Sequence, residues 1–143
     1  MNDLEEAIQI GRRVLKAAPD DNPKLADCFA MLGFVLRTRY DCKGQMCDLE
    51  EAIRMYRQAV HNVPDDHPHL PSWLSVFSFA LQAQFERVGQ LCDLEEAIRM
   101  YRQAIHNLPD DHSTLHALLT GLGIAFLIRY ECLGQMDDLE EAI

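Results

Sequence analysis

The chain has 143 residues, which is the size of one domain, and 48% of them are hydrophobic, which is enough for a continuous core. Six prolines and seven glycines are too few for a disordered chain. The formal net charge of -10 argues against binding to nucleic acid or to an anionic membrane, because neutralising phosphates requires clustered Lys and Arg.

The sequence is organised by an internal repeat. The hexapeptide Asp-Leu-Glu-Glu-Ala-Ile occurs four times at a spacing of 45 residues, beginning at Asp3, Asp48, Asp93 and Asp138. The segment Asp48–His67 returns almost unchanged as Asp93–His112. Self-similarity at a fixed period of about 20–50 residues is typical of stacked repeat arrays. We therefore expect one repeat domain over residues 1–143, with units 3–47, 48–92 and 93–137 and a truncated fourth unit, 138–143.

The first part of each unit predicts a short helix, best defined from Asp48 to about Asn62. Asp48 followed by Glu51 is a capping-box arrangement, in which side chains bond the first free backbone N–H groups. Apolar residues recur at three- and four-residue steps, and Pro64 ends the helix. The same pattern predicts helices within Asp3–Pro19 and Asp93–Pro109.

The second part of each unit predicts a longer helix. These helices are expected at about residues 23–43, 68–88 and 113–133. Each carries an apolar stripe at helical spacing, such as Leu74, Phe77, Leu81 and Phe85. Gly44, Gly89 and Gly134 follow the three helices, where a left-handed C-cap favours glycine.

Two residue patterns recur through the units. Long helices carry Leu32-Gly33 with Val35, Phe77-Ser78 with Ala80, and Leu122-Gly123 with Ala125. Short helices carry Ala52, Tyr56, Ala59 and Pro64, matched by Ala97, Tyr101, Ala104 and Pro109, and in part by Ala7, Gly11, Val14 and Pro19. These patterns resemble the consensus of the tetratricopeptide repeat. The long period and the motif G-Q-x-x-D-L-E-E-A-I resemble long-period arrays of this family in large fungal proteins.

This resemblance implies an all-α fold, a right-handed superhelical solenoid of antiparallel helix pairs. It also implies a non-catalytic protein-interaction scaffold whose long helices line an inner, concave face. The inner-face residues would be Asp27, Ala30, Phe34, Arg37, Thr38, Ser75, Phe79, Gln82, Thr120, Ile124 and Leu127. Phe34, Phe79 and Ile124 recur once per unit. Either they grip an extended or helical apolar peptide, or they are buried as a second core seam.

A second hypothesis is structural, with the array assembling with itself and no ligand in its groove. The first short helix has no preceding long helix to cover it, and the unit after the last long helix stops after six residues. The bare ends would join copies into a homo-oligomer through Leu4, Ile8, Leu15, Phe126, Tyr130 and Leu133. The contact would propagate as a chain, or like ends would pair as a dimer.

Other chemistry finds little support. Histidines gather in the turns (His61, His67 and His69; His106, His112 and His116), but without cysteine, so we expect no metal site and no cofactor. No Ser or Cys has a base at the spacing of a known nucleophile motif, so we expect no enzyme. The five cysteines are odd in number and include no C-x-x-C pair. The sequence also shows no signal peptide and no long apolar span. We therefore expect reduced thiols in a cytoplasmic protein.

Overall fold

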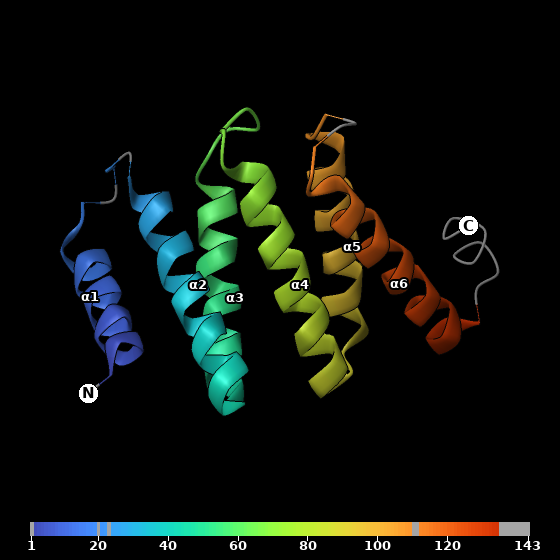
Figure 1. Ribbon diagram of the computed structural model, residues 1–143, viewed down its shortest axis with the longest axis horizontal. Helices are drawn as coiled ribbons and strands as arrows, with labels where there is room; N and C mark the ends of the chain where they lie inside the picture. The colour runs from blue at the N-terminus through green and yellow to red at the C-terminus, as the bar shows by residue number, and fades with distance from the viewer. Residues whose placement is uncertain (1, 20, 23, 110–111, 135–143) are drawn as a thin grey trace. The chain divides into compact units, whose positions relative to one another are not determined.

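The computed structural model describes residues 2–19, 21–22, 24–109 and 112–134, and these form six α-helices (Figure 1). The helices are α1 (Asp3–Ala17), α2 (Leu25–Lys43), α3 (Met46–His61), α4 (Leu70–Val88), α5 (Leu91–His106) and α6 (Leu115–Leu133). Short helices therefore alternate with long ones, as the repeat predicts, and the all-α expectation is confirmed. The truncated fourth unit, 138–143, lies outside the described residues.

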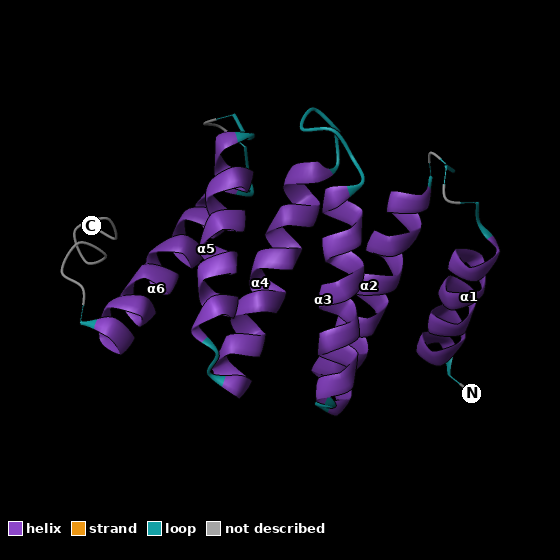
Figure 2. Ribbon diagram, turned by 180° about the vertical axis from the view of Figure 1, so that it is seen from behind, coloured by secondary structure: helices purple, strands orange, loops and turns teal. Residues whose placement is uncertain are grey.

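The chain divides into two compact units, Met1–Trp73 and Leu74–Ile143. In the first unit α1 packs on α2, and α2 packs on α3 as an antiparallel pair (Figures 1 and 2). In the second unit α5 packs on α6 in the same way. The right-handed superhelix expected of such an array stays a prediction.

Small residues in the long helices allow the aromatic residues of the short helices to pack closely. A Cβ atom added to Gly33 would lie 2.9 Å from the Tyr56 ring, and Tyr56 is 1% exposed. In the second unit a Cβ on Gly121 would lie 2.9 Å from the buried Tyr101 ring. Tyr56 of α3 and Tyr101 of α5 are therefore main elements of the core.

In the first helix pair the small residue is on the short helix and the large residue is on the long helix. Gly11 stands at the repeat position of Tyr56 and Tyr101. A Cβ on Gly11 would lie 3.4 Å from the Met31 side chain and 3.1 Å from that of Leu32. Met31 stands in turn at the repeat position of Gly121. Large and small side chains have thus changed places between the two helix pairs.

The predicted glycine C-caps are confirmed. Gly44 (φ 71°) and Gly89 (φ 80°) adopt the left-handed conformation, as does Gly134 (φ 69°). The N–H of Gly44 donates to the carbonyl of Tyr40, and the N–H of Gly89 to that of Phe85, both at 2.7 Å. These bonds satisfy carbonyls left free at the helix ends, and residues with a Cβ rarely adopt this backbone conformation.

The predicted capping role of Asp48 is wrong, because α3 begins two residues earlier, at Met46, after Gln45. Asp48 lies within the first turn and is 1% exposed. Its carboxylate accepts hydrogen bonds from Arg39 Nε at 2.9 Å and Arg39 Nη2 at 2.7 Å. Glu51, the other member of the expected capping box, pairs with Arg12 of α1. Both acids therefore join helices instead of capping one.

The other copies of the hexapeptide show the same departure. In α5, Asp93 is 7% exposed and accepts a hydrogen bond from Gln84 Nε2 at 3.0 Å. In α1, the N-cap is Asn2, whose Oδ1 accepts from the Glu5 N–H at 2.8 Å. The acid of the hexapeptide caps none of the three described short helices.

A polar side chain accepts a backbone hydrogen bond within the turn before each long helix. Asn22 Oδ1 accepts from the Lys24 N–H at 2.9 Å. At the same repeat position, His67 Nδ1 accepts from the N–H of His69, and His112 Nδ1 from that of Thr114, each at 3.1 Å. The histidines that resembled metal ligands in the sequence thus have a structural use.

Candidate interaction surfaces

The predicted inner-face residues differ in exposure. Asp27, Phe34, Phe79, Thr120, Ile124 and Leu127 are exposed, whereas Arg37, Thr38 and Gln82 are half-buried. Ala30 and Ser75 are 8% and 6% exposed, so they are core residues and cannot contact a partner in this structure. Small residues at these positions serve the packing of their helices instead.

Three large apolar side chains stand at one repeat position and are exposed. Phe34 on α2 is 62% exposed, Phe79 on α4 is 37% exposed and Ile124 on α6 is 45% exposed. We call these three residues the exposed apolar positions. They do not form a second buried core seam in either unit. Exposing such side chains to water is unfavourable, so a repeated exposed position favours an interaction surface.

Phe34 lines a hollow between α1 and α2. This α1–α2 hollow has a volume of about 420 Å³ and is lined by Asp3, Leu4, Ala7, Phe34, Val35 and Thr38. In the second unit, Phe79 lies edge-on to the Tyr101 ring, with ring centroids 5.5 Å apart. The Tyr101 hydroxyl donates to Gln82 Oε1 at 2.8 Å. Gln82 is therefore held toward the core by this bond.

Polar groups beside the exposed apolar positions bond within their own helices. The Thr38 hydroxyl donates to the carbonyl of Phe34 at 2.9 Å, and that of Thr120 to the carbonyl of His116 at 2.9 Å. Arg37 pairs with Asp41 at 3.1 Å. Because these polar groups are already bonded, a partner would mainly contact the apolar side chains.

The residues predicted for end-to-end assembly fall into two groups. Leu4, Leu15 and Tyr130 are half-buried, and Leu133 is 41% exposed. Ile8 is 1% exposed and Phe126 is 3% exposed, so the prediction that these two are bare is wrong. Ile8 occupies the same core position as Ile53 and Ile98, which are 3% and 2% exposed.

Phe126 stands at the repeat position of Leu36 and Leu81, which are both 0% exposed, so it is a core residue, and two arginines lie against its ring. The guanidinium of Arg102, from α5, lies 5.0 Å from the ring centroid, and that of Arg129, from α6 itself, lies 5.4 Å away. Such cation–π contacts add to the packing of α6 on α5. The repeat position itself indicates a buried residue here.

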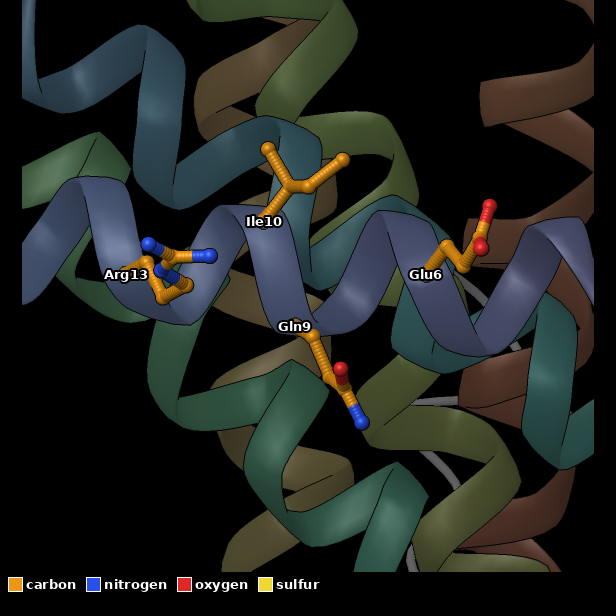
Figure 3. A pocket seen from close by; sticks show the side chains of 4 residues that line it. All are labelled: Glu6, Gln9, Ile10 and Arg13. Atoms are coloured by element: carbon orange, nitrogen blue, oxygen red, sulfur yellow. The ribbon is translucent and has the colours of Figure 1, made fainter. Parts of the chain in front are cut away.

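A second hollow lies on α1 alone. Glu6, Gln9, Ile10 and Arg13 line about 300 Å³ of it (Figure 3). Its side chains come from successive turns of one helix and spread apart in Figure 3. A surface built by one helix encloses no ligand, so this hollow is a weak candidate site.

The thiols and histidines form no evident chemical centre. Cys28, Cys42, Cys47, Cys92 and Cys132 are all free. Within the part of the chain that the structure describes, no group of three or more His, Cys, Asp or Glu side chains could hold a metal ion. Asp110 and Asp111, which the sequence places near the second histidine cluster, lie outside that part.

The expectation of no long apolar span needs correction. α6 is long and apolar enough to cross a membrane by length and composition, with 22% of the segment buried. Core helices of soluble proteins pass the same test, and α6 packs on α5. The notable property of α6 is therefore the apolar surface that it leaves uncovered.

Comparison with known proteins agrees with this geometry. Residues 25–69, which contain the α2–α3 pair, match the family model of the tetratricopeptide repeat. Among solved structures, the chain is similar to the crystal structure of nearly identical TPR-like repeats from a candidate kinesin light chain of Podospora anserina. The TM-score is 0.65 and the identity is 18%. The match covers 97% of this chain and 65% of that one, and no curated protein matches.

Proposed function

We propose that this chain, which contains a tetratricopeptide repeat and has the antiparallel helix-pair fold of such arrays, is a non-catalytic scaffold that binds a protein or peptide. The observation that carries this proposal is the set of exposed apolar positions, Phe34, Phe79 and Ile124. The five free cysteines fit a cytoplasmic setting.

The proposed ligand is an apolar segment, extended or helical, of a partner protein. Within the second unit, Phe79 and Ile124 stand one repeat period apart, which suits a ligand that presents apolar groups at intervals along its length. Thr38, Thr120 and Arg37 are bonded within their helices, so the proposed contact depends on apolar area more than on polar readout. Phe34, with the largest exposed fraction of the three, is the expected anchor.

Peptide selection tests this function. Peptides would be selected from a displayed random library on the immobilised chain, and their Kd values measured by fluorescence polarisation. Phe34→Asp and Ile124→Asp should each weaken binding by about tenfold or more, as expected for anchor residues. Gln58→Asp adds the same charge at an exposed position of α3 and should change Kd little. Equal effects of all three substitutions would overturn the proposed surface.

A second candidate function is self-assembly, in which the array stacks with copies of itself. The observation that favours it is the surface of α1, where the first copy of the repeated hexapeptide is less buried than the copies in α3 and α5. Sedimentation velocity over a wide concentration range tests this function. Concentration-dependent growth supports it, and a persistent monomer contradicts it.

A further inference from the structure

The two core tyrosines differ in what their hydroxyl groups bond. Tyr56 of α3 and Tyr101 of α5 stand at the same repeat position and are 1% and 0% exposed. The Tyr101 hydroxyl donates to Gln82 Oε1 at 2.8 Å. Within the part of the chain that the structure describes, the Tyr56 hydroxyl bonds no side chain and no backbone group. One of two equivalent donors is therefore unused.

The Tyr56 hydroxyl reaches the protein surface. Among the described residues, every fully buried side-chain nitrogen or oxygen has a hydrogen-bond partner. Because the Tyr56 oxygen has none, it is not one of the fully buried atoms, and the small exposed area of this residue includes it. The ring is held against α2, where a Cβ on Gly33 would lie 2.9 Å from it. A closely packed ring thus presents one donor to a group from outside the chain.

One residue of α2 explains the difference between the two tyrosines. Arg37 stands at the repeat position of Gln82. A guanidinium has only donors, so Arg37 cannot accept the hydroxyl hydrogen as the Gln82 amide oxygen does. Burial raises the pKa of the Tyr56 hydroxyl and the positive charge of Arg37 opposes this shift, so the guanidinium lies near the hydroxyl. Two donor groups therefore lie close together in the first unit.

The charges near these donors favour a neutral acceptor. Arg37 Nε donates to Asp41 Oδ1 at 3.1 Å, and the two Nη groups of the guanidinium can donate elsewhere. Besides burial, the Asp41 carboxylate raises the pKa of Tyr56, so its negative charge also acts at the hydroxyl. A second carboxylate would be repelled by Asp41 and by the net charge of -10. An amide oxygen avoids this repulsion, and Gln82 shows that such an oxygen suits the tyrosine hydroxyl.

We propose that the Tyr56 hydroxyl and the Arg37 guanidinium bind an amide carbonyl oxygen of the peptide that the chain recognises. This oxygen takes the place that Gln82 Oε1 has beside Tyr101. Phe34 lies one turn before Arg37 on the same face of α2 and is 62% exposed, so a peptide side chain on Phe34 brings a carbonyl to the two donors. This inference rests on the proposed function, to which it adds one polar contact that orients the peptide.

Removing the hydroxyl donor tests the contact. Peptides selected on the immobilised chain serve as probes, and fluorescence polarisation gives their Kd values. Tyr56→Phe keeps the ring and should raise Kd by about three- to tenfold, the usual effect of one hydrogen bond. Tyr101→Phe is the matched control, because its hydroxyl is already bonded to Gln82, and it should change Kd little. Circular dichroism confirms that each variant is folded.

Supplying the acceptor from the chain itself gives a second test. Arg37→Gln copies the arrangement of the second unit, so the new amide should accept from the Tyr56 hydroxyl and should raise Kd as well. Combining it with Tyr56→Phe should weaken binding no further than the stronger single change, because both remove one contact. Arg54→Gln removes the same charge at an exposed position of α3 and should have little effect. Additive losses in the double variant would overturn the shared contact.

Changes in the peptide identify the source of the oxygen. Leu in place of a Gln or Asn removes a side-chain amide, and an ester in place of one backbone amide weakens that carbonyl as an acceptor. The change at the contact should weaken binding to the wild type and not to the Tyr56→Phe chain. The same result at a peptide carboxylate would overturn the proposed neutral acceptor.

The outcomes separate this inference from the proposed function. If Phe34→Asp weakens binding and Tyr56→Phe does not, the hydroxyl bonds only water, and this inference alone is overturned. If no peptide is selected at all, the proposed function is contradicted together with it.

Discussion

At the scale of single residues, the carboxylate of Asp48 has a different role from the one its sequence position predicts. It is buried, and both of its oxygens bond one guanidinium on the preceding helix. Removing one partner of a buried ion pair leaves the other charge unpaired, which costs more than losing a helix cap. The size of the effect therefore distinguishes the two roles.

We expect Asp48→Ala to lower the free energy of unfolding by about 3 kcal/mol or more, because Arg39 then loses its partner at a site where only 20% of its side chain is exposed. Asp93→Ala should cost less, about 1–3 kcal/mol, because the partner left behind is the neutral Gln84. Urea unfolding measures both. Equal losses of about 0.5–2 kcal/mol in both variants would mean that the two aspartates act as helix caps after all.

Tyr56 predicts a loss of stability at alkaline pH. Burial raises the pKa of its hydroxyl well above the ordinary value, and the positive charge of Arg37 opposes this shift. The folded state therefore keeps a proton that the unfolded state loses above about pH 10. The stabilisation is complete below that pH and is lost as the pH rises further, by up to about 1.4 kcal/mol per pH unit.

The Tyr56→Phe variant isolates this effect, because it removes the ionisable group and keeps the ring that packs on Gly33. Between about pH 9 and pH 11, urea unfolding of the wild type should weaken more than that of the variant. Parallel loss of stability in the two proteins would mean that Tyr56 ionises as easily in the folded chain as in the unfolded one.

At the scale of helices, the sequence predicts the long helices well and the starts of the short ones less well. Glycine C-caps and apolar stripes locate the ends and faces of α2, α4 and α6. The short helices α3 and α5 begin at Met46 and Leu91, after glutamines whose side chains make no capping bond. No local signal marks such a start, and the capping-box pattern two residues later points to the wrong residue.

The turn before α6 gives a prediction about helix starts. The His112 side chain accepts a backbone hydrogen bond that Asn22 accepts in the first repeat unit. His112→Ala should therefore cost about 0.5–1.5 kcal/mol, the usual net contribution of one hydrogen bond. His112→Asn should restore most of this, since the amide oxygen has the same use at position 22. Thermal unfolding of the two variants measures both effects, and equal destabilisation by both would mean that this hydrogen bond does not stabilise the turn.

At the scale of the whole molecule, the repeat period predicts which positions are core and which are exposed, and this holds for Ile8 and Phe126 as well. Phe34, Phe79 and Ile124 are exposed at one repeat position, as an interaction surface requires. The prediction that Ile8 and Phe126 are bare considers only which helices precede and follow. Their repeat positions predict burial, because Ile53 and Ile98 match Ile8, and Leu36 and Leu81 match Phe126.

The core assignment can be tested through the unfolding of the whole chain. Leu81 is 0% exposed, so Leu81→Ala should cost about 2–5 kcal/mol through lost burial and the cavity that remains. Leu127 is 42% exposed, and Leu127→Ala should change the unfolding free energy by about 0.5 kcal/mol or less. A smaller cost at Leu81 than at Leu127 would mean that the faces of the long helices are assigned wrongly.

The exchange of large and small side chains between helix pairs makes the order of the repeat units matter. Gly11 faces Met31 and Leu32 in the first pair, whereas Tyr101 faces Gly121 in the last. A gene rearrangement that brought Tyr101 against Met31 would crowd the junction, and one that brought Gly11 against Gly121 would leave a void. The side-chain volumes at the repeat positions of Gly11 and Met31 therefore restrict which rearranged arrays would still fold. The units are not interchangeable, although they share the same hexapeptide.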